Sequence, residues 1–454
     1  MNSDDLRPKT LPEDKITEAN TEKLNEQNQS PPARNKTTGS GPGSENVINE
    51  PLAVLNGKKI LLTVTGGVAA YKAAGLAHLM TKAGAQVRVI ITEAGERFVT
   101  ALTFSALTGH SVATDMWTRS GTMETVPHVA WAEWADLLIT APASADFLAK
   151  LAHGLAGDLA SAVALAYRGP RLIAPAMNTG MYLNQATVAN LDILRSRDYK
   201  VLESPVGLLA CGTSGPGRMA EPEVIAYEAA RLLSGGALKN KKVLVTGGAT
   251  QESWDDIRFL SNRSSGRMGL ALAKSAWIMG AQVTYLAGPT AATLEHDLSE
   301  LTVKKVESTG ELLLEVKNNL LGAWALVMNA APADFTPAEK IIGKINKSES
   351  KITSLALKRT PDILKEVSPI KGNCLVVGFA AEEKDLIERA KEKLQSKNLD
   401  YIAANQAGGP DSAFGTDSIK LTLISSKQNM IEIGPGSKFQ ASWDLWQALA
   451  EGWN

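Results

Sequence analysis

The sequence contains only two cysteines, Cys211 and Cys374, among its 454 residues. Two cysteines so far apart match neither the spacing of a metal site nor a disulfide framework, and they are typical of a chain in a reducing cytoplasm. An excess of charge is also lacking, because 47 Lys and Arg are balanced by 48 Asp and Glu, for a formal net charge of -1. A nucleic-acid partner held by bulk electrostatics is therefore not expected.

Long apolar runs are absent as well. No run reaches the length of a membrane-spanning helix, so we expect no membrane partner. The first fifty or so residues are mostly polar and charged with few aliphatic side chains, and they cannot bury enough surface to offset their ordering entropy. They lack the apolar core of a secretory signal and are too acidic for a transit peptide. We interpret residues 1–51 as a disordered tail.

The rest of the chain contains two similar segments. KKILLTVTGG begins at Lys58 and is followed by a helical pattern and the returning stretch KAGAQVRVI; KKVLVTGG begins at Lys241 and is followed by a helical pattern and IMGAQVTYL. Each is typical of a parallel βαβ unit. The sequence therefore predicts an α/β fold with two tandem Rossmann-like domains and mainly parallel sheets, over residues 52–236 and 237–454, joined near Ser234–Gly236.

Short apolar runs that end in small or polar residues give the expected strands, as in a parallel sheet covered on both faces. In the first domain these are residues 60–64, 87–91, 137–140 and 172–174. In the second they are residues 243–246, 283–287, 326–330, 375–380 and 401–404. Residues 419–424 and 430–433 largely alternate polar and apolar side chains, which predicts an antiparallel hairpin added to the second sheet.

The two segments differ by an insertion. Only the second carries WDDIRFLSNRSSGRM, Trp254 to Met268, between its glycine turn and its returning strand. Polar groups at this place in a βαβ unit most plausibly meet a ligand. The insertion is the first indication of a functional site.

Several places in the first domain are candidates for chemistry. The turn TGGVAAYKAA, from Thr65, lies at a strand-to-helix junction where free N–H groups can hold a phosphate, although such a turn is also common as a plain tight turn. His128 follows a proline at an expected helix start, where it is either an active-site group or a solvent-facing cap. In APASAD, Ser144 is an expected helix N-cap, and the small side chains would admit a flat ring.

Two further places lie later in the first domain. Asn178 in APAMNTGMY offers an amide for a carboxylate, or is simply a turn residue. Cys211 lies in the glycine-rich stretch LLACGTSGPGRMAEP with Arg218, which indicates a flap over a substrate or an unreactive surface thiol. Cys374, in NCLVVGF, is interpreted as a small core residue.

These motifs resemble a known pair of enzymes. GGVAAYK, HVAWAEWAD, APASAD, PAMN and CGTSGPGRM occur in the order seen in the flavin-dependent phosphopantothenoylcysteine decarboxylases. VTGGATQESWDDIRFLSNRSSGRMG, NAAPADF, KINK, PDIL, VGFAAE and KNLD resemble phosphopantothenate-cysteine ligase. Together the two domains resemble the bifunctional bacterial enzymes of coenzyme A biosynthesis, over everything except the tail.

For the first domain, the resemblance implies a decarboxylase that uses FMN. In this family the flavin oxidises the substrate thiol to a thioaldehyde, carbon dioxide then leaves, and the flavin returns its hydride, so no nicotinamide is needed. The resemblance implies that His128 is the active-site base, that Asn178 binds the substrate carboxylate and that Cys211 supplies a proton. It places FMN against Gly67, Val68, Ala69, Thr92, Ser144, Ala145 and Ala176.

For the second domain, the resemblance implies that CTP activates phosphopantothenate as an acyl-cytidylate, from which cysteine displaces CMP. Lys344 then acts at the reacting phosphate, and Asn262 holds the acyl intermediate. The CTP contacts, with Mg²⁺ bridging the phosphates, fall on Asp334, Lys344, Pro361, Asp362, Ile363, Leu364, Phe379, Lys393 and Lys397. Without the resemblance, Lys393 and Lys397 would be interpreted as a solvated helix face.

The sequence departs from the family pattern at three positions. Ser253 and Asp256 replace prolines that would stiffen the insertion, and Pro332 replaces a valine in NAAPADF. The added charge of Asp256 beside Asp255 is expected to weaken phosphate binding unless Arg258 or Arg263 offsets it.

Other classes of protein make different predictions. A flavin-binding regulatory subunit without turnover would be expected to lack the histidine or the flap cysteine, and both are present. A dinucleotide-dependent oxidoreductase would need a full G-x-G-x-x-G, which neither glycine turn has. The resemblance further implies a homo-oligomer built from decarboxylase trimers, up to a dodecamer, with paired ligase domains.

Overall fold

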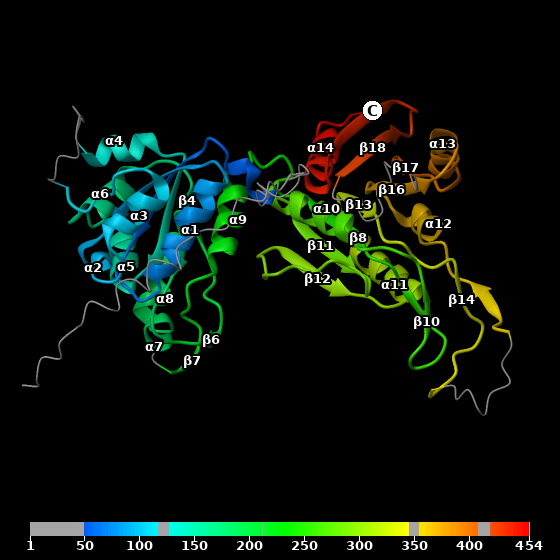
Figure 1. Cartoon of the computed structure of the whole chain (residues 1–454), viewed down its shortest axis with the longest axis horizontal. Helices are drawn as coiled ribbons and strands as arrows, with labels where there is room; N and C mark the ends of the chain where they lie inside the picture. The colour runs from blue at the N-terminus through cyan, green and yellow to red at the C-terminus, as the bar shows by residue number, and fades with distance from the viewer. Residues whose placement is uncertain (1–49, 117–126, 211, 345–353, 407–417, 454) are drawn as a thin grey trace, which may run out of the picture. The chain divides into compact units, whose positions relative to one another are not determined.

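The computed structural model describes residues 50–116, 127–210, 212–344, 354–406 and 418–453 (Figure 1). Most of the expected tail therefore lies outside the described residues. Its last two residues, Glu50 and Pro51, begin the 3₁₀ helix η2 (Glu50–Leu55). They are ordered there because Leu52 and Leu55 of the same turn are fully buried.

The first sheet is parallel throughout and has the strand order β2-β1-β3-β4-β5. Its strands are β1 (Lys59–Val64), β2 (Gln86–Ile91), β3 (Leu137–Ala143), β4 (Arg171–Pro175) and β5 (Tyr199–Val201). The four strands predicted from apolar runs are present. The fifth, β5, is the short YKV and has no apolar run to reveal it.

Helices cover both faces of this sheet. One face packs on α1 (Ala70–Lys82), α3 (Ala101–Thr108) and α9 (Pro222–Leu233). The other packs on α4 (Pro127–Trp134), α5 (Ala145–His153), α6 (Leu159–Ala166) and α8 (Gln185–Ser196). The short helices α2 (Glu93–Glu96) and α7 (Thr179–Tyr182) follow the carboxyl ends of β2 and β4.

The second sheet has eight strands in the order β12-β11-β8-β13-β16-β17-β18-β19. The first six are parallel: β12 (Leu301–Lys305), β11 (Gln282–Ala287), β8 (Lys242–Gly247), β13 (Ala325–Met328), β16 (Leu375–Glu382) and β17 (Tyr401–Gln406). The last two, β18 (Ser418–Ser425) and β19 (Met430–Ser437), are antiparallel and form the predicted hairpin.

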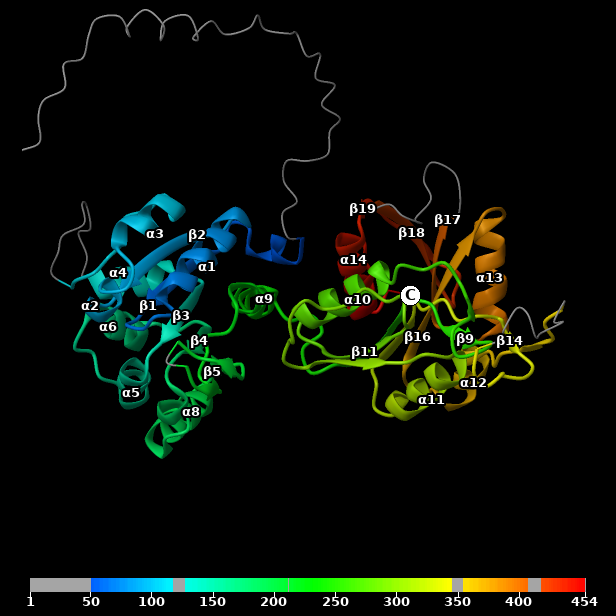
Figure 2. The same ribbon diagram turned by 60° about the horizontal axis from the view of Figure 1, so that its bottom comes forward.

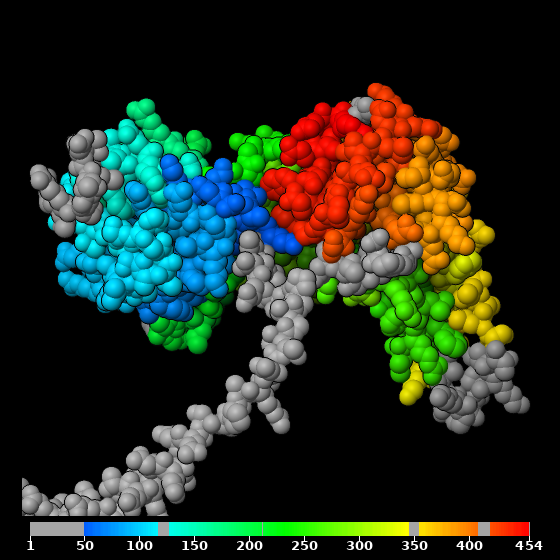
Figure 3. Space-filling model, turned by 45° about the horizontal axis from the view of Figure 1, so that its top comes forward, coloured from blue at the N-terminus to red at the C-terminus, as the bar shows by residue number. Residues whose placement is uncertain are grey.

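Helices also cover both faces of the second sheet (Figure 2). One face packs on α10 (Arg267–Ile278) and α14 (Lys438–Ala450), and the other on α11 (Thr309–Leu320), α12 (Ile363–Val367) and α13 (Leu386–Ser396). A 3₁₀ turn, η3 (Ser368–Ile370), continues α12. In the space-filling view, the red C-terminal helix lies beside the orange hairpin strands that it packs against (Figure 3).

Three small antiparallel pairs lie outside the two main sheets. They are β6 (Gly207–Leu208) with β7 (Ser214–Gly215), β9 (Gln251–Ser253) with β10 (Phe259–Ser261), and β14 (Phe335–Pro337) with β15 (Leu357–Arg359). The pair β9–β10 encloses the first residues of the insertion of the second domain, which therefore form a hairpin rather than an irregular loop.

The similarity of the two βαβ units extends to their burial. Strands β2 and β11, which both begin at the glutamine of Gly-Ala-Gln-Val, have the same order of exposed and buried positions. Two tandem Rossmann-like domains with mainly parallel sheets, as predicted, are thus confirmed. Among the described helices, none combines the length and the apolar character that crossing a membrane requires.

Candidate active sites

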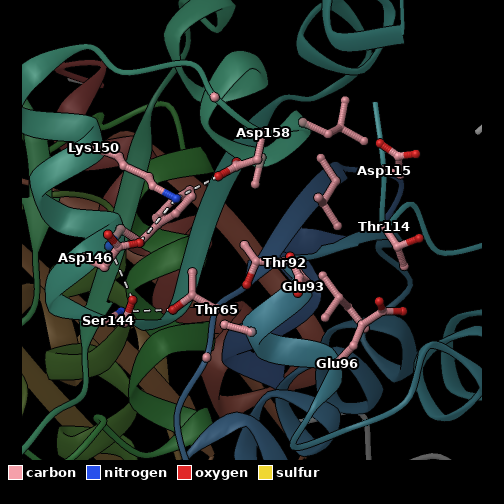
Figure 4. Close-up of a pocket in the computed structure, with 18 of the residues that line it drawn as sticks. Thr65, Thr92, Glu93, Glu96, Thr114, Asp115, Ser144, Asp146, Lys150 and Asp158 are labelled. Carbon is pink, nitrogen blue, oxygen red and sulfur yellow. Dashed lines mark hydrogen bonds and ion pairs between the residues drawn. The ribbon is translucent and has the colours of Figure 1, made fainter. Parts of the chain in front are cut away.

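The first candidate site lies at the carboxyl ends of β1, β2 and β3. In the order 2-1-3-4-5, the connections from β1 and β3 lead to opposite faces of the sheet, and ligands of such sheets bind at this switch point. A cavity of about 760 Å³ opens there, within the range of small-molecule and cofactor sites (Figure 4). Its lining includes Thr65, Gly66, Thr92 and Ser144.

Hydroxyl groups fix the strand ends around this cavity. The Thr65 hydroxyl donates to the Pro142 carbonyl at 2.8 Å and accepts from the Ser144 N–H at 2.9 Å, so it ties the end of β1 to the end of β3. Thr92 is the N-cap of α2, and Ser144 is the N-cap of α5, as expected. Both capping hydroxyls line the cavity, so capping and ligand contact coincide at these residues.

One wall of the cavity is charged. Lys150 pairs with Asp158 at 3.0 Å and with Asp146 at 3.2 Å (Figure 4). The hydrogen bond to Asp158 raises the pKa of Lys150 although burial opposes it. Burial alone would raise the pKa of Asp158, but the Ser161 N–H, Lys150 and the Ser161 hydroxyl together lower it. No sequence motif indicates this group; its one signal is the i, i+4 spacing of Asp146 and Lys150.

The residues expected to hold the flavin surround the same strand ends. Gly67, Val68 and Ala69 form the turn between β1 and α1, with Val68 exposed. Ala145 begins α5, and the Ala176 N–H donates to the Ala143 carbonyl at 3.0 Å. Of the expected flavin residues, Thr92 and Ser144 line the cavity itself, whereas these five lie beside it in the chain or the sheet.

The PAMN segment and the glycine-rich stretch meet. The Met177 N–H donates to the Gly217 carbonyl at 2.9 Å, and a side chain at Gly217 would lie about 2.3 Å from the Met177 carbonyl oxygen. Asn178 is exposed, and its side-chain oxygen caps α7 by accepting from the Gly180 N–H. This capping agrees with the turn interpretation and leaves substrate binding as a prediction.

A carboxylate connects the glycine-rich stretch to the first helix. Glu221 accepts from Lys72 at 2.7 Å and from Arg218 at 3.4 Å, so α1 and the end of the flap are held at one point. Cys211 itself lies outside the described residues, between the paired strands β6 and β7. The Leu209 N–H donates to the Thr213 carbonyl at 2.8 Å, which closes the hairpin around that position.

His128 lies in the first turn of α4, which begins at Pro127 as the sequence predicts. Its Nδ1 is buried, and within the described part of the chain no hydrogen-bond partner is found for it. A buried imidazole nitrogen without a partner is costly unless a ligand or another chain completes it. The described contacts do not join His128 to Asn178 or to the cavity lining.

The second candidate site lies where β8 and β13 end. Numbered within the domain, the parallel strands have the order 3-2-1-4-5-6, and β8 and β13 flank the switch point. The Thr246 hydroxyl, on β8, accepts from the N–H groups of Asn329 and Ala330 at 3.1 and 3.0 Å. The Thr250 hydroxyl accepts from the Ala333 N–H at 2.9 Å, so the NAAPADF segment is fastened to the glycine turn.

The insertion reaches the same segment. The side-chain amide of Asn262 donates to the Pro332 carbonyl at 2.9 Å. Two residues after Pro332, the Asp334 carbonyl accepts from the Thr360 N–H at 3.1 Å. This bond brings the PDIL turn against NAAPADF. Three motifs that are far apart in the sequence therefore meet at one end of the sheet.

The PDIL turn has mainly structural contacts. Asp362 is the N-cap of α12, and Ile363 packs in the core on that face of the sheet. Because the Ile363 side chain is buried, any contact that this residue makes with a nucleotide has to come from its backbone. Pro361 is exposed, Leu364 is half-buried, and Phe379 is half-buried on β16.

The two expected lysines, Lys393 on α13 and Lys397 at its C-cap, are not free on a solvated face. Lys393 pairs with Glu382, at the end of β16, at 2.5 Å, and Lys397 pairs with Asp362 at 3.4 Å. Glu382 also accepts from Arg389, and the hydrogen bonds from Lys393 and Arg389 lower the pKa of Glu382. Helix α13 thus presents a row of cations toward the ends of the strands. Sequence reasoning missed Glu382 and Arg389, and the i, i+4 spacing of Arg389 and Lys393 is their only signal.

Lys344 is exposed and is the last described residue before a gap. Two of the three residues before it are connected to the insertion: the Ile341 N–H donates to the Trp254 carbonyl, and the Gly343 N–H donates to the Asp256 carboxylate. Arg258 pairs with Asp255, the neighbour of Asp256, at 3.2 Å.

Two α/β domains, each with polar groups gathered at its switch point, define a two-site enzyme rather than a single nucleotide-binding module. Family models agree with this division: the "Flavoprotein" model matches residues 48–234, and the "DNA/pantothenate metabolism flavoprotein C-terminal domain" model matches residues 238–452.

Relatives match nearly the whole chain. The Coenzyme A biosynthesis bifunctional protein CoaBC of Bacillus subtilis is 39% identical over 401 residues, which cover 87% of this chain and 98% of the relative. The protein of the same name from Haemophilus influenzae is 38% identical with the same coverage. A crystal structure of the C-terminal domain of such a protein is 30% identical and covers 48% of this chain and 97% of its own, with a TM-score of 0.40.

The chain belongs to the family of coenzyme A biosynthesis bifunctional proteins. The prediction of a bifunctional enzyme with decarboxylase and ligase domains is confirmed. The alternative of a flavin-binding regulatory subunit is not favoured, because the chain matches bifunctional relatives along almost their entire length.

Proposed function

We propose that the second domain joins 4'-phosphopantothenate to cysteine with CTP, and that the first domain decarboxylates the product to 4'-phosphopantetheine with FMN. The observation that carries the proposal is the contact between the insertion and NAAPADF, in which Asn262 donates to the Pro332 carbonyl. Through this contact the specific motif SNRSSGRMG lies at the switch point of the sheet, where ligands of such sheets bind.

FMN fits the described residues of the first domain. The cavity has the size of a cofactor site, and two capping hydroxyls, Thr92 and Ser144, line it. Its carboxylates make the charged wall unsuitable for a phosphate, whereas the turn Gly67–Ala69 offers backbone N–H groups. We assign the phosphate to this turn, and the uncharged parts of the cofactor to Thr92, Ser144, Ala145 and Ala176.

Bound FMN would supply a two-electron acceptor for the substrate thiol. Side chains of the protein then transfer the protons and orient the substrate carboxylate. His128, whose Nδ1 is buried without a described partner, accepts the proton. Asn178 orients the substrate carboxylate, and Cys211 returns a proton from the glycine-rich flap. The contact of Met177 with Gly217 supports this assignment, because it holds the flap against PAMN.

In the ligase reaction, the carboxylate oxygen of phosphopantothenate attacks the α-phosphorus of CTP, and pyrophosphate leaves. Lys344 offsets the negative charge that builds on the phosphate, and Asn262 holds the acyl group of the intermediate. The amine of cysteine then attacks the acyl carbon, and CMP leaves. The amide of Asn262 is suited to this role because its contact with Pro332 fixes its position.

CTP would lie between NAAPADF and α13. Asp334, the turn Pro361–Leu364 and Phe379 surround the expected base and ribose, and Lys393 and Lys397 offer cations to the phosphates. Among the described residues, no three side chains of His, Cys, Asp or Glu gather as a metal cage. Mg²⁺ would therefore be held mainly by phosphate oxygens and water, as is usual for this ion.

Exposed apolar side chains support a homo-oligomer. Tyr71 on α1, Met181 and Leu183 around α7, and Leu208 on β6 are all at least half exposed. Large exposed apolar side chains are typical of a surface that another copy covers where they form one patch. A trimer of the first domain, extended to a dodecamer, is the assembly that we propose.

The test begins with the visible spectrum of the purified protein, followed by products from phosphopantothenate, cysteine and CTP. We expect bound flavin, release of CMP and formation of phosphopantetheine. Lys344→Gln is expected to slow CMP release about a hundredfold, because it removes one stabilising group of the transition state. Cys211→Ser is expected to leave CMP release intact. Phosphopantothenoylcysteine should then accumulate, because its decarboxylation is blocked.

Mass spectrometry of the products separates the two effects, flavin absorbance shows that the first domain is folded, and circular dichroism shows that the whole chain is folded in each variant. Flavin without CMP or phosphopantetheine in the unmodified protein would contradict the proposal and favour a regulatory flavoprotein. Release of CMP with CTP alone, compared with release of AMP with ATP alone, decides the nucleotide.

A further inference from the structure

The tip of the insertion is a closed turn. The Trp254 N–H donates to the Arg258 carbonyl at 2.8 Å. The buried carboxylate of Asp255 accepts from the N–H groups of Ile257 at 2.8 Å and Arg258 at 2.6 Å. The Arg258 guanidinium adds a contact with Asp255 and lies 5.6 Å from the centre of the Trp254 ring. These contacts fix the direction in which residue 256 faces.

The base of the turn is fastened to the domain. Strands β9 and β10 pair on either side of it. The buried carboxylate of Glu252 accepts from the N–H and the hydroxyl of Thr309, both at 2.8 Å, at the start of α11. The Ser261 hydroxyl donates to the Thr250 carbonyl at 2.7 Å. The turn is therefore a rigid arm that extends from the end of the sheet.

The arm holds the chain just before Lys344. The Ile341 N–H donates to the Trp254 carbonyl at 3.0 Å, and the Gly343 N–H donates to the Asp256 carboxylate at 2.9 Å. Gly343 has a φ of +83°, which an L side chain rarely adopts, so this peptide depends on its glycine and on the bond that orients it. The green segment of the arm and the yellow segment after β14 both lie on the surface (Figure 3).

We propose that Asp256 is a positioning residue for Lys344. Its carboxylate accepts a charge-assisted hydrogen bond from the peptide that precedes the lysine, and such bonds are short and directional. The inference rests on the proposed role of Lys344 and adds the group that holds its backbone. The family pattern has a proline here, which stiffens the arm but has no side-chain acceptor, so this chain fixes the segment by a different means.

The proposal replaces the expectation that Asp256 only weakens phosphate binding. If its charge acted on the nucleotide, the uncharged isostere Asn would behave like Ala. If its oxygen holds Gly343, Asn would behave like Asp, because an amide oxygen is still an acceptor. The two explanations therefore predict different results for one substitution.

The experiment compares Asp256→Ala, Asp256→Asn and Glu339→Ala in the full-length protein. Glu339 is an exposed carboxylate of the same segment for which the structure gives no hydrogen bond, so its removal is the control for charge. We expect Asp256→Ala to lower kcat for CMP release about tenfold with KM for CTP within about twofold, because a misplaced group costs rate rather than nucleotide binding. Asp256→Asn and Glu339→Ala should remain close to the unmodified enzyme.

Amide hydrogen exchange in the peptide Ile341–Lys344 gives a readout that does not depend on activity. It should become faster in Asp256→Ala and not in Asp256→Asn, with exchange elsewhere unchanged as evidence of folding. Equal effects of Ala and Asn, or an unchanged kcat in Asp256→Ala, would overturn the proposal. If Lys344→Gln keeps full activity while exchange still depends on Asp256, the role of Lys344 fails and the contact of Asp256 stands.

Discussion

At the scale of single residues, the two thiols of the chain are expected to differ in reactivity. Cys374 is buried immediately before β16, and burial together with Asp400 raises the pKa of its thiol to about 11. Cys211 belongs to a glycine-rich stretch, where the sequence predicts intermittent exposure. Because the thiolate is the reactive form, the two residues should differ in alkylation.

We expect iodoacetamide to modify Cys211 in the folded protein at pH 8 and to leave Cys374 unmodified. At that pH a thiol with a pKa near 11 is about 0.1% thiolate, and labelling of Cys374 should rise as the pH approaches 11. Peptide mass spectrometry over time measures both rates, and denatured protein, in which both thiols react, is the control. Equal rates in the folded protein would refute the assignment of Cys374 to the core.

The sequence motifs predicted which residues belong to the candidate sites. They did not predict the hydrogen-bond and ion-pair partners of those residues. The sequence places Lys393 and Lys397 on a helix, and it cannot show that Glu382 and Asp362 meet them, because those contacts depend on where β16 ends and where α12 begins. In the same way, the sequence shows Asp256 as an extra charge. Its bond to the Gly343 N–H depends on the fold of the arm, so it appears only in the structure.

At the scale of elements, the helix that follows the charged wall depends on one carboxylate. Asp158 caps α6 by accepting from the Ser161 N–H at 2.8 Å, and the Ser161 hydroxyl donates back toward Asp158 at 2.8 Å. The same carboxylate pairs with Lys150. The helix behind it is short and almost entirely buried, so the cap is an important part of its stability.

Asp158→Ala should lower the free energy of unfolding of the first domain by about 1–2 kcal/mol, the usual cost of a lost N-cap. The pKa of Asp158 is lowered in the folded state, so its stabilisation is present above the ordinary aspartate pKa and disappears as the pH falls through the folded value. Urea titrations at pH 7 and near pH 3 measure the difference, with Asp146→Ala as the exposed control. If the loss of unfolding free energy in Asp158→Ala is as large near pH 3 as at pH 7, this linkage is contradicted.

Elements that carry an apolar run were predicted, and those without one were not. Strand β12, LTVKK, is mostly exposed at the edge of its sheet, and β5 is three residues long, so neither gives a periodic signal. The pairs β9–β10 and β14–β15 are held by contacts with distant segments rather than by their own composition. The sequence located the insertion, and the structure was needed to show that it is a rigid hairpin.

At the scale of the whole molecule, the two candidate sites are separate. Each site is assembled at the switch point of its own sheet, and the described contacts around Thr65 and Thr246 stay within one domain. The product of the ligase site is the substrate of the decarboxylase site. A defect in one domain should therefore be complemented by an intact copy of that domain on another chain.

We expect an equimolar mixture of Cys211→Ser and Lys344→Gln proteins to form phosphopantetheine at about half the rate of the same total amount of unmodified enzyme. Neither variant alone should do so at a comparable rate. Product formation measured at several enzyme concentrations, with CMP release as the control, tests the prediction. A mixture that releases CMP and yet makes no phosphopantetheine would show that the intermediate has to pass within one chain.

The added hairpin has a consequence for how the second sheet ends. Strand β19 is the last in the order, and it contains Pro435, which has no N–H to donate. Its pairing with β18 also shifts register between Ile419 and Leu421. An edge with a proline and an irregular register is a poor template for a strand from another molecule. The sheet therefore ends in a strand that discourages edge-to-edge aggregation on this side.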